Sequence, residues 1–128
     1  MSVLGIGTDI VDIKRFRAVV EKRGKNFLGK IFTDKELEYA ENKKFFHAHM
    51  AGKFSAKEAV KKALPDGARI GLNWSEIEIL NHSDGKPYVQ LHGQAEEIMK
   101  EFKITRVLVS VSHTDDIATS NAMAVKDV

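Results

Sequence analysis

The strongest constraint on the fold of this chain is that helical and strand patterns occupy largely separate parts of the sequence. After a β-branched stretch, Val3–Val11, apolar residues recur at helical spacing as far as Leu64, where Pro65 and Gly67 stop the pattern. Beyond that point, short segments alternate apolar and polar residues, which is typical of strands. Separated helices and strands favour an α+β fold. At 128 residues and 43% hydrophobic composition, the chain is expected to form a single domain, 1–128, with its own core.

The expected elements follow from these periods and from local capping signals. The N-terminal strand is followed by a helix that Asp12 caps and that Gly24 ends. Thr33 and Glu36 have the spacing of a capping box and open a further helical stretch, with a break expected near His47–His49. A hairpin over 75–92, a helix over 95–102 and strands over 107–111 and 117–125 complete an antiparallel sheet packed with helices.

The composition excludes several classes of protein. There are no cysteines, so disulfides, thiol catalysis and cysteine-built zinc sites are ruled out. The N-terminus has neither a basic region nor an apolar stretch of signal-peptide length, and no run approaches the roughly 20 apolar residues that span a bilayer. We therefore expect a soluble cytoplasmic protein without membrane contact. The 20 Lys and Arg against 18 Asp and Glu leave a net charge of +2, too small to imply nucleic-acid binding.

Basic residues nevertheless gather in the stretch 14–30. Only one residue of this stretch, Glu21, is acidic. A solvated charged face explains such a cluster, and a polyanionic partner is the alternative. The non-enzymatic hypothesis is a small RNA-binding α+β module that uses this stretch as a basic arm. Against it, the chain has only seven Phe, two Tyr and one Trp, and none of them forms a clear stacking platform on a strand.

Asp9 is the first residue that conflicts with local preferences. Aspartate is depleted in strands, and here it follows Gly5 and Gly7 among apolar residues. Strand glycines leave room for a group to approach the backbone, and a carboxylate there is a candidate ligand for Mg²⁺, which prefers oxygen donors. A strand-end aspartate that caps the next turn explains the same spacing. Asp12 is not an obvious partner, because positions 9 and 12 point to opposite faces of a strand.

The helical stretch from residue 53 carries the second such feature. Lys53, Lys57 and Lys61 stack at intervals of four residues, where like charges repel, and an anion lying against them would relieve the repulsion. Alternatively, the lysine stems cover apolar surface while the ammonium groups reach water. Glu58 lies one turn before Lys62. This is either an ordinary helix ion pair or a carboxylate for a metal ion beside an ammonium for a phosphate.

Five separated motifs give the chain a resemblance to a known family. They are Gly5-Ile6-Gly7-Thr8-Asp9-Ile10-Val11, Phe32-Thr33-x-x-Glu36, Lys53-Phe54-Ser55-Ala56-Lys57-Glu58-Ala59-x-x-Lys62-Ala63, Gly85-Lys86-Pro87 and Val111-Ser112-His113-Thr114. In this order they resemble holo-[acyl-carrier-protein] synthase, the short single-domain type of 4′-phosphopantetheinyl transferase. The resemblance implies the fold of that type. It also implies transfer of the phosphopantetheine arm of coenzyme A to a serine of apo acyl carrier protein, with release of adenosine 3′,5′-bisphosphate.

The resemblance also assigns roles to individual residues. Asp9 and Glu58 match magnesium ligands, and Lys62 matches a lysine beside the phosphates of the coenzyme, so these three are the expected catalytic residues. Glu58, or a metal-held water in its reach, is the implied base for the serine, whereas the capping box gives Glu36 a sufficient structural role. The implied coenzyme contacts are Lys53, Lys57, Lys62, Gly85, Lys86, Pro87, His113 and Thr114.

The resemblance further implies protein partners. Acyl carrier proteins are acidic, and Lys14, Arg15 and Arg17 are expected to engage the carrier by charge complementarity. The family is typically a homotrimer with active sites between subunits, and the same assembly is expected here.

Some positions depart from the family pattern. Lys53 stands where the family often has arginine, and a point charge does not reproduce a bidentate phosphate contact. Pro65-Asp66-Gly67 replaces the usual glycine-rich turn, and no role is carried onto the segment Asn42–His49. Within that segment, His47 and His49 are two residues apart and diverge on a helix, so we do not expect them to bind a metal.

Overall fold

The structure, a computed structural model, describes residues 1–65 and 71–128. Its elements in chain order are β1 (Ser2–Asp12), α1 (Ile13–Ile31), α2 (Asp34–Ala40), α3 (Phe46–Ala63), the 3₁₀ turn η1 (Trp74–Glu76), β2 (Ile77–Asn81), β3 (Pro87–Leu91), α4 (Gly93–Glu101), β4 (Arg106–His113) and β5 (Ile117–Lys126). This order confirms the predicted α+β class, including the hairpin and the two C-terminal strands.

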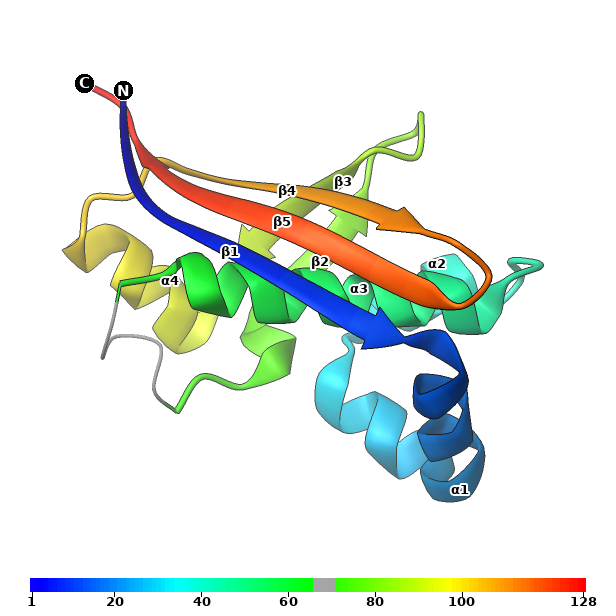
Figure 1. The fold of residues 1–128 in the computed structure, drawn as a ribbon. Coiled ribbons are helices and arrows are strands. Elements are labelled where there is room, and N and C mark those ends of the chain that lie inside the picture. Colours follow the sequence, from blue (N-terminus) through cyan, green and yellow to red (C-terminus); the bar gives the residue numbers. More distant parts are fainter. Residues whose placement is uncertain (66–70) are drawn as a thin grey trace.

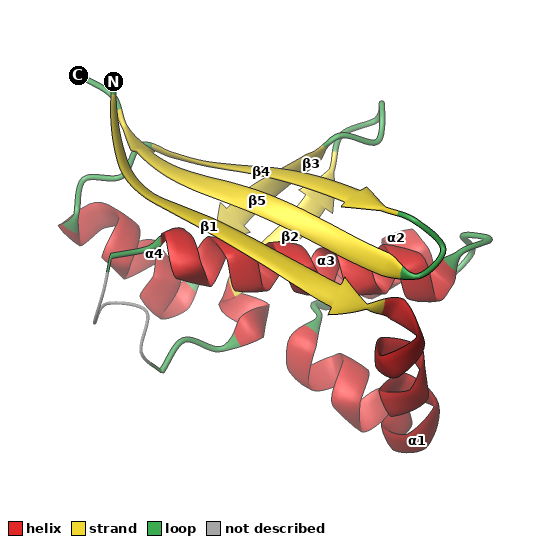
Figure 2. Cartoon of the chain, viewed as in Figure 1, coloured by secondary structure: helices red, strands yellow, loops and turns green. Residues whose placement is uncertain are grey.

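The strands form two antiparallel sheets. β1, β5 and β4 make a three-stranded sheet in that spatial order, and β2 pairs with β3 in a separate hairpin. The helices gather on one side of the three-stranded sheet, and α3 runs along that face (Figure 2). The two chain termini lie side by side at one end of the sheet (Figure 1). In the described part of the chain, no helix has the length and apolar character needed to cross a bilayer.

The core consists of two clusters that share α3. In one cluster, Val60 of α3 packs with Ile77 and Ile79 of the hairpin. In the other, Met50 of α3 packs with Phe16 of α1. Because α3 is buried on several sides, packing fixes its rotation about its own axis, and the polar side chains that it carries have set directions.

The backbone of α3 approaches β1 most closely at Gly5 and Gly7. A Cβ atom at Gly5 would overlap the carbonyl oxygen of Ala63, and one at Gly7 would overlap that of Ala59. The space that these glycines leave is therefore filled by the helix, and the ligand that the sequence suggested there is not needed to explain it. This contact brings Asp9, two residues further along β1, beside the C-terminal half of α3.

Two predicted helix boundaries are wrong. Gly24 does not end the first helix: it adopts a φ of 60°, which a residue without a side chain tolerates, and α1 resumes beyond this kink as far as Ile31. The break expected near His47–His49 lies earlier, between the end of α2 at Ala40 and the start of α3 at Phe46.

The predicted capping signals are confirmed. The side chain of Asp12 accepts a hydrogen bond from the backbone N–H of Arg15 at 3.0 Å. Thr33 and Glu36 form both halves of a capping box at the start of α2. The helix stop predicted at Pro65-Asp66-Gly67 agrees with the end of α3 at Ala63, but Asp66 and Gly67 themselves lie outside the described residues.

We predict that Gly7→Ala destabilises the protein by about 3 kcal/mol, because the new methyl group forces α3 away from β1. Gly29→Ala is the matched control: no atom lies near its added methyl group, and alanine in a helix gains up to about 1 kcal/mol over glycine. Urea unfolding of the two variants measures both effects. A Gly7→Ala protein as stable as the unmodified chain contradicts the close contact.

Candidate active site

The backbone of Asp9 is held from two sides. Its carbonyl oxygen accepts hydrogen bonds from Ser55 Oγ of α3 at 3.2 Å and from Thr119 Oγ1 of β5 at 3.0 Å. Ser55 is also hydrogen-bonded to Ser120, which lies opposite Asp9 in the β1–β5 register, at 2.7 Å. The position of Asp9 relative to both the sheet and α3 is therefore fixed independently of its carboxylate.

The Asp9 carboxylate lies beside Lys62 and Glu58 of α3. Lys62 Nζ is 3.3 Å from Asp9 Oδ1 and donates to the Thr8 carbonyl oxygen at 2.9 Å. Burial raises the pKa of Asp9, the hydrogen bond and charge of Lys62 oppose this shift, and the negative charge of Glu58 adds to it. The structure thus brings the three residues with predicted catalytic roles into one electrostatic cluster.

Glu58 is held by an aromatic residue from outside α3. Its Oε1 atom accepts a hydrogen bond from the indole Nε1–H of Trp74, the first residue of η1. The Trp74 ring packs against Phe54 with a centroid separation of 5.9 Å, and Lys61 Nζ lies 5.3 Å from the ring centroid on its face. One oxygen of the Glu58 carboxylate is therefore oriented by the protein itself.

The donor set of this cluster suits a magnesium ion. Asp9 and Glu58 supply carboxylate oxygens, the donors that Mg²⁺ prefers, and this ion usually takes only one or two of them from a protein. Within residues 1–65 and 71–128, no group of three or more His, Cys, Asp and Glu residues is arranged to hold a metal ion. The partly buried Asp9 and the negative charge of Glu58 near it make the cluster a candidate site for one divalent cation.

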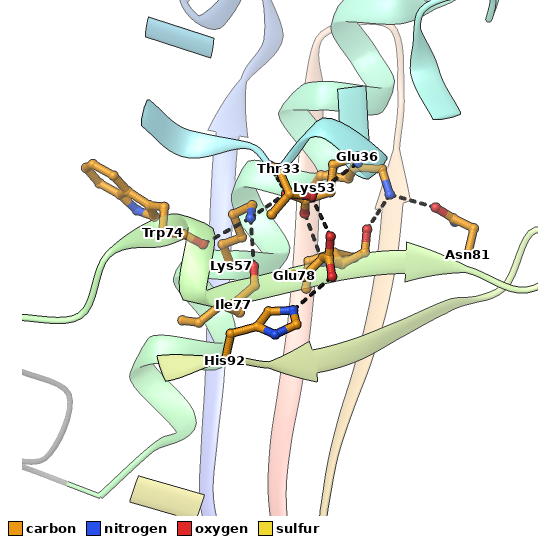
Figure 3. A network of polar contacts seen from close by, with 10 residues as sticks. Thr33, Glu36, Lys53, Lys57, Trp74, Ile77, Glu78, Asn81 and His92 are labelled. Atoms are coloured by element: carbon orange, nitrogen blue, oxygen red, sulfur yellow. Dashed lines mark hydrogen bonds and ion pairs between the residues drawn. The ribbon is translucent and has the colours of Figure 1, made fainter. Parts of the chain in front are cut away.

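Lys57 has partners other than the predicted phosphate. Its side chain is completely buried, and Nζ donates to Glu36 Oε1 at 2.8 Å, Trp74 O at 3.0 Å and Ile77 O at 2.7 Å (Figure 3). An ammonium group has three N–H donors, and this network uses them all. Lys57 is thus in position neither to bind a coenzyme phosphate nor to extend into water, the two alternatives that its spacing on the helix suggested.

Glu36 is the acceptor on which the buried network converges. Besides Lys57, its carboxylate accepts hydrogen bonds from the backbone N–H groups of Thr33 and Ile79, each at 2.8 Å. It therefore joins α2, α3 and β2, a structural role wider than the helix cap that the sequence pattern predicted.

Lys53 is also buried, one turn earlier on the same helix. Its Nζ donates to the Ile79 carbonyl oxygen and to Asn81 Oδ1, each at 2.6 Å, and burial lowers the pKa of Lys53 to about 8. Together with Gly85, Pro87 and His113, it lines a cavity of about 220 Å³. Four of the predicted coenzyme contacts therefore surround one cavity, although Lys53 is engaged by protein acceptors.

This cavity and the carboxylate cluster lie on different sides of α3. Glu58 lies five residues beyond Lys53, which is about 140° around a helix. None of Asp9, Glu58 and Lys62 lines the cavity. A single chain therefore carries the predicted coenzyme contacts in two separate groups.

The remaining predicted contacts are exposed. Lys86 lies in the turn of the β2–β3 hairpin, and Thr114 lies in the turn between β4 and β5, where its hydroxyl accepts from the backbone N–H of Ile117 at 3.2 Å. His113 Nδ1 is 3.2 Å from the Thr114 carbonyl oxygen, and the His113 ring lies 6.4 Å from that of His49.

The predicted carrier-binding residues lie on the first turns of α1. Lys14, Arg15 and Arg17 are exposed there, and Arg17 Nε is 2.7 Å from the carboxylate of Glu21. Arg15 lines a groove between α1 and β1 together with the exposed side chain of Ile10. This groove combines positive charge with apolar surface.

Sequence reasoning missed several residues of the site. Ser55 stands inside the motif that carries the resemblance, but its hydrogen bonds to Asp9 and Ser120 join positions far apart in the chain. Trp74 contacts Glu58 from a segment to which no role was assigned. Trp74 is the single tryptophan of the chain, and this is the one sequence signal that could have drawn attention to it.

Comparisons with known proteins agree with this geometry. A family model described as the 4′-phosphopantetheinyl transferase superfamily matches residues 5–120. The chain belongs to this superfamily. A curated relative named holo-[acyl-carrier-protein] synthase, from Caldanaerobacter subterraneus subsp. tengcongensis, is 47% identical over 120 residues, which cover 94% of this chain and 93% of the relative.

Solved structures of holo-[acyl-carrier-protein] synthases have the same fold. The one from Neisseria meningitidis is 32% identical, with a TM-score of 0.86. The match covers 98% of this chain and 100% of the Neisseria meningitidis chain. The one from Helicobacter pylori, solved in complex with coenzyme A, is 30% identical, with a TM-score of 0.80 and coverage of 94% and 99%. The chain is therefore an enzyme of the phosphopantetheinyl transferase family, which favours the transferase over the RNA-binding hypothesis.

We predict that Lys57→Met destabilises the protein by about 3 to 5 kcal/mol, because it leaves the Glu36 carboxylate buried without its counter-charge. Adding Glu36→Gln to Lys57→Met removes that charge and recovers part of the loss. Lys61→Met, one turn further along α3, changes stability by less than about 1 kcal/mol. Guanidinium unfolding measures all three. A stable Lys57→Met protein that binds coenzyme A poorly would instead support the phosphate contact predicted from the sequence.

Proposed function

We propose that this enzyme transfers the 4′-phosphopantetheine arm of coenzyme A to a serine hydroxyl of apo acyl carrier protein, with adenosine 3′,5′-bisphosphate as the second product. The names of its curated relatives and the coenzyme A complex of the Helicobacter pylori protein support this substrate pair. The observation that carries the proposal is the cluster of Asp9, Glu58 and Lys62, because it combines metal-binding oxygens with a cation for phosphate.

Asp9 and Glu58 would hold a Mg²⁺ ion, with Asp9 fixed by Ser55 and Thr119 and Glu58 oriented by Trp74. When bound, the ion supplies positive charge to the pyrophosphate of the coenzyme. Lys62 extends this charge, since its exposed ammonium lies at the edge of the cluster.

The transfer exchanges one phosphorus–oxygen bond for another. The carrier serine oxygen attacks the phosphorus that bears the pantetheine arm, and the bond from that phosphorus to the leaving adenosine 3′,5′-bisphosphate breaks. Lys62 stabilises the charge that develops on the leaving phosphate. Glu58, or a water molecule in its reach, is the candidate acceptor for the serine proton.

We further propose that the enzyme is a homotrimer whose sites each combine the two groups of coenzyme contacts from adjacent subunits. Two observations support a shared site: the groups lie on different sides of α3 within one chain, and the three-stranded sheet exposes apolar side chains. Ile6 is 72% exposed and Ile10 65% exposed, and both belong to β1. Apolar surface exposed in this way is typical of a protein–protein interface. The cytoplasmic location expected from the sequence stays a prediction.

The basic first turns of α1 provide the docking surface for the carrier in this proposal. Arg15 and Ile10 both line the groove, and Lys14 extends the positive field. Complementary charge of this kind increases the encounter rate with an acidic partner and orients it.

We predict that the purified protein, with Mg²⁺, coenzyme A and an apo acyl carrier protein, adds the mass of one phosphopantetheine arm to the carrier. Asp9→Asn is expected to lower the rate at least about 100-fold, because a neutral amide is a poorer magnesium ligand. Asp12→Asn is the matched control and keeps the rate, since asparagine caps α1 as well as aspartate does. Intact-protein mass spectrometry of the carrier measures the transfer.

The same assay separates carrier docking from chemistry. Arg15→Glu is expected to raise the KM for the carrier while leaving the KM for coenzyme A unchanged. Absence of transfer by the folded, metal-supplied protein to any carrier contradicts the proposed activity, and a near-normal rate for Asp9→Asn contradicts its metal role.

A further inference from the structure

We propose that Trp74 is a positioning residue for the Glu58 carboxylate, and that its indole N–H sets the affinity of the site for the divalent cation. This inference rests on the proposed function, which gives Glu58 its role as a metal ligand. Neither the resemblance of the sequence nor the comparisons assign a role to position 74.

The contact between Trp74 and Glu58 by itself restricts the Glu58 carboxylate. The indole Nε1–H of Trp74 donates a hydrogen bond to Oε1 of Glu58. An indole nitrogen is a donor only and carries no charge, so it orients the ionised carboxylate without neutralising it. A glutamate side chain free to rotate loses rotamer entropy when it binds a metal ion. Because Trp74 already restricts Glu58, a large part of this cost is met in the folded protein.

Trp74 is itself held from three directions. Its backbone carbonyl oxygen accepts a hydrogen bond from the buried Lys57 at 3.0 Å, its ring packs on Phe54, and the Lys61 ammonium lies over the ring face at 5.3 Å. A series of hydrogen bonds from Glu36 through Lys57 and Trp74 to Glu58 therefore connects the buried ion pair to the carboxylate cluster. The donor of each of these hydrogen bonds is Lys57 of α3 or Trp74 of η1, so Lys57 is connected to the Glu58 carboxylate through Trp74.

Packing alone is the competing explanation for a tryptophan at this position. The ring belongs to the apolar cluster beneath α1 and α3, and any large aromatic side chain satisfies that requirement. A benzene ring lacks the indole N–H and is also smaller, so the test needs a control that disturbs the packing but keeps the N–H. Trp74→Phe therefore removes the hydrogen bond and retains an aromatic ring against Phe54.

The test compares Mn²⁺ binding by the full-length chain and three variants in the presence of coenzyme A, with free Mn²⁺ measured by electron paramagnetic resonance and a blank of coenzyme alone. We expect Trp74→Phe to raise the dissociation constant for Mn²⁺ about 10-fold, in the range found for residues that orient metal ligands. Phe54→Leu is the matched control: it disturbs the packing of the Trp74 ring but keeps the N–H, so binding stays within about twofold of the unmodified protein even if its Tm falls.

The same loss appears in the kinetics as a raised Mg²⁺ requirement. Excess Mg²⁺ is expected to restore most of the transfer rate of Trp74→Phe, because the carboxylate ligands remain. Phe54→Leu, which keeps the N–H, is expected to show the Mg²⁺ requirement of the unmodified protein. In the unmodified protein, Mn²⁺ is also expected to quench the fluorescence of Trp74, the single tryptophan, and Glu58→Gln to abolish that quenching.

The outcomes distinguish the positioning role of Trp74 from the proposed metal-ligand role of Glu58 on which it rests. If Glu58→Gln weakens Mn²⁺ binding while Trp74→Phe binds as the unmodified protein does, the positioning role is wrong and the metal site stands. If Phe54→Leu weakens binding as much as Trp74→Phe, packing explains the effect and the inference fails. If Glu58→Gln binds Mn²⁺ normally, the metal role of Glu58 fails and the role of Trp74 fails with it.

Discussion

The close contact between the backbones of α3 and β1 is the constraint on which the rest of the structure depends. Side chains larger than hydrogen at positions 5 and 7 would overlap carbonyl oxygens of α3, so only glycine permits this separation. The contact sets Asp9 on the strand against Glu58 and Lys62 on the helix. Ser55 and Thr119 then fix the backbone of Asp9 within that contact. The proposed catalytic cluster is therefore a consequence of how a helix packs on a sheet.

On its other side, α3 is fixed by a buried ion pair. Such pairs are costly to desolvate and contribute little net stability, but removing one partner is strongly destabilising. Lys57 binds two backbone carbonyl oxygens as well as Glu36, which restricts η1 and β2 to one register against the helix. That restriction places the Trp74 indole beside Glu58. The contact with β1 thus fixes Asp9, and the Lys57 network fixes the residue that orients Glu58.

Local patterns predicted most of the fold, and long-range contacts account for what they missed. Asp12, Thr33 and Glu36 were identified as caps because capping depends on residues within one turn. Gly24 was misjudged because a glycine that kinks a helix and one that ends it look alike without the packing that follows. The spacing of Lys53 and Lys57 left open whether they face an anion or water, since spacing shows which side chains share a face but not what covers it; both are buried. Trp74 and Ser120 reach the site from distant segments, and no local pattern reveals such contacts.

The most direct test of this account is a crystal structure of the protein with coenzyme A and Mn²⁺, in which anomalous scattering locates the metal ion. The account predicts one ion per site, liganded by Asp9 and Glu58 and in contact with the pyrophosphate. It further predicts that Lys53, Gly85 and His113 of a neighbouring subunit line the opposite side of the coenzyme. An ion bound away from both carboxylates, or a coenzyme enclosed entirely by one chain, would contradict it.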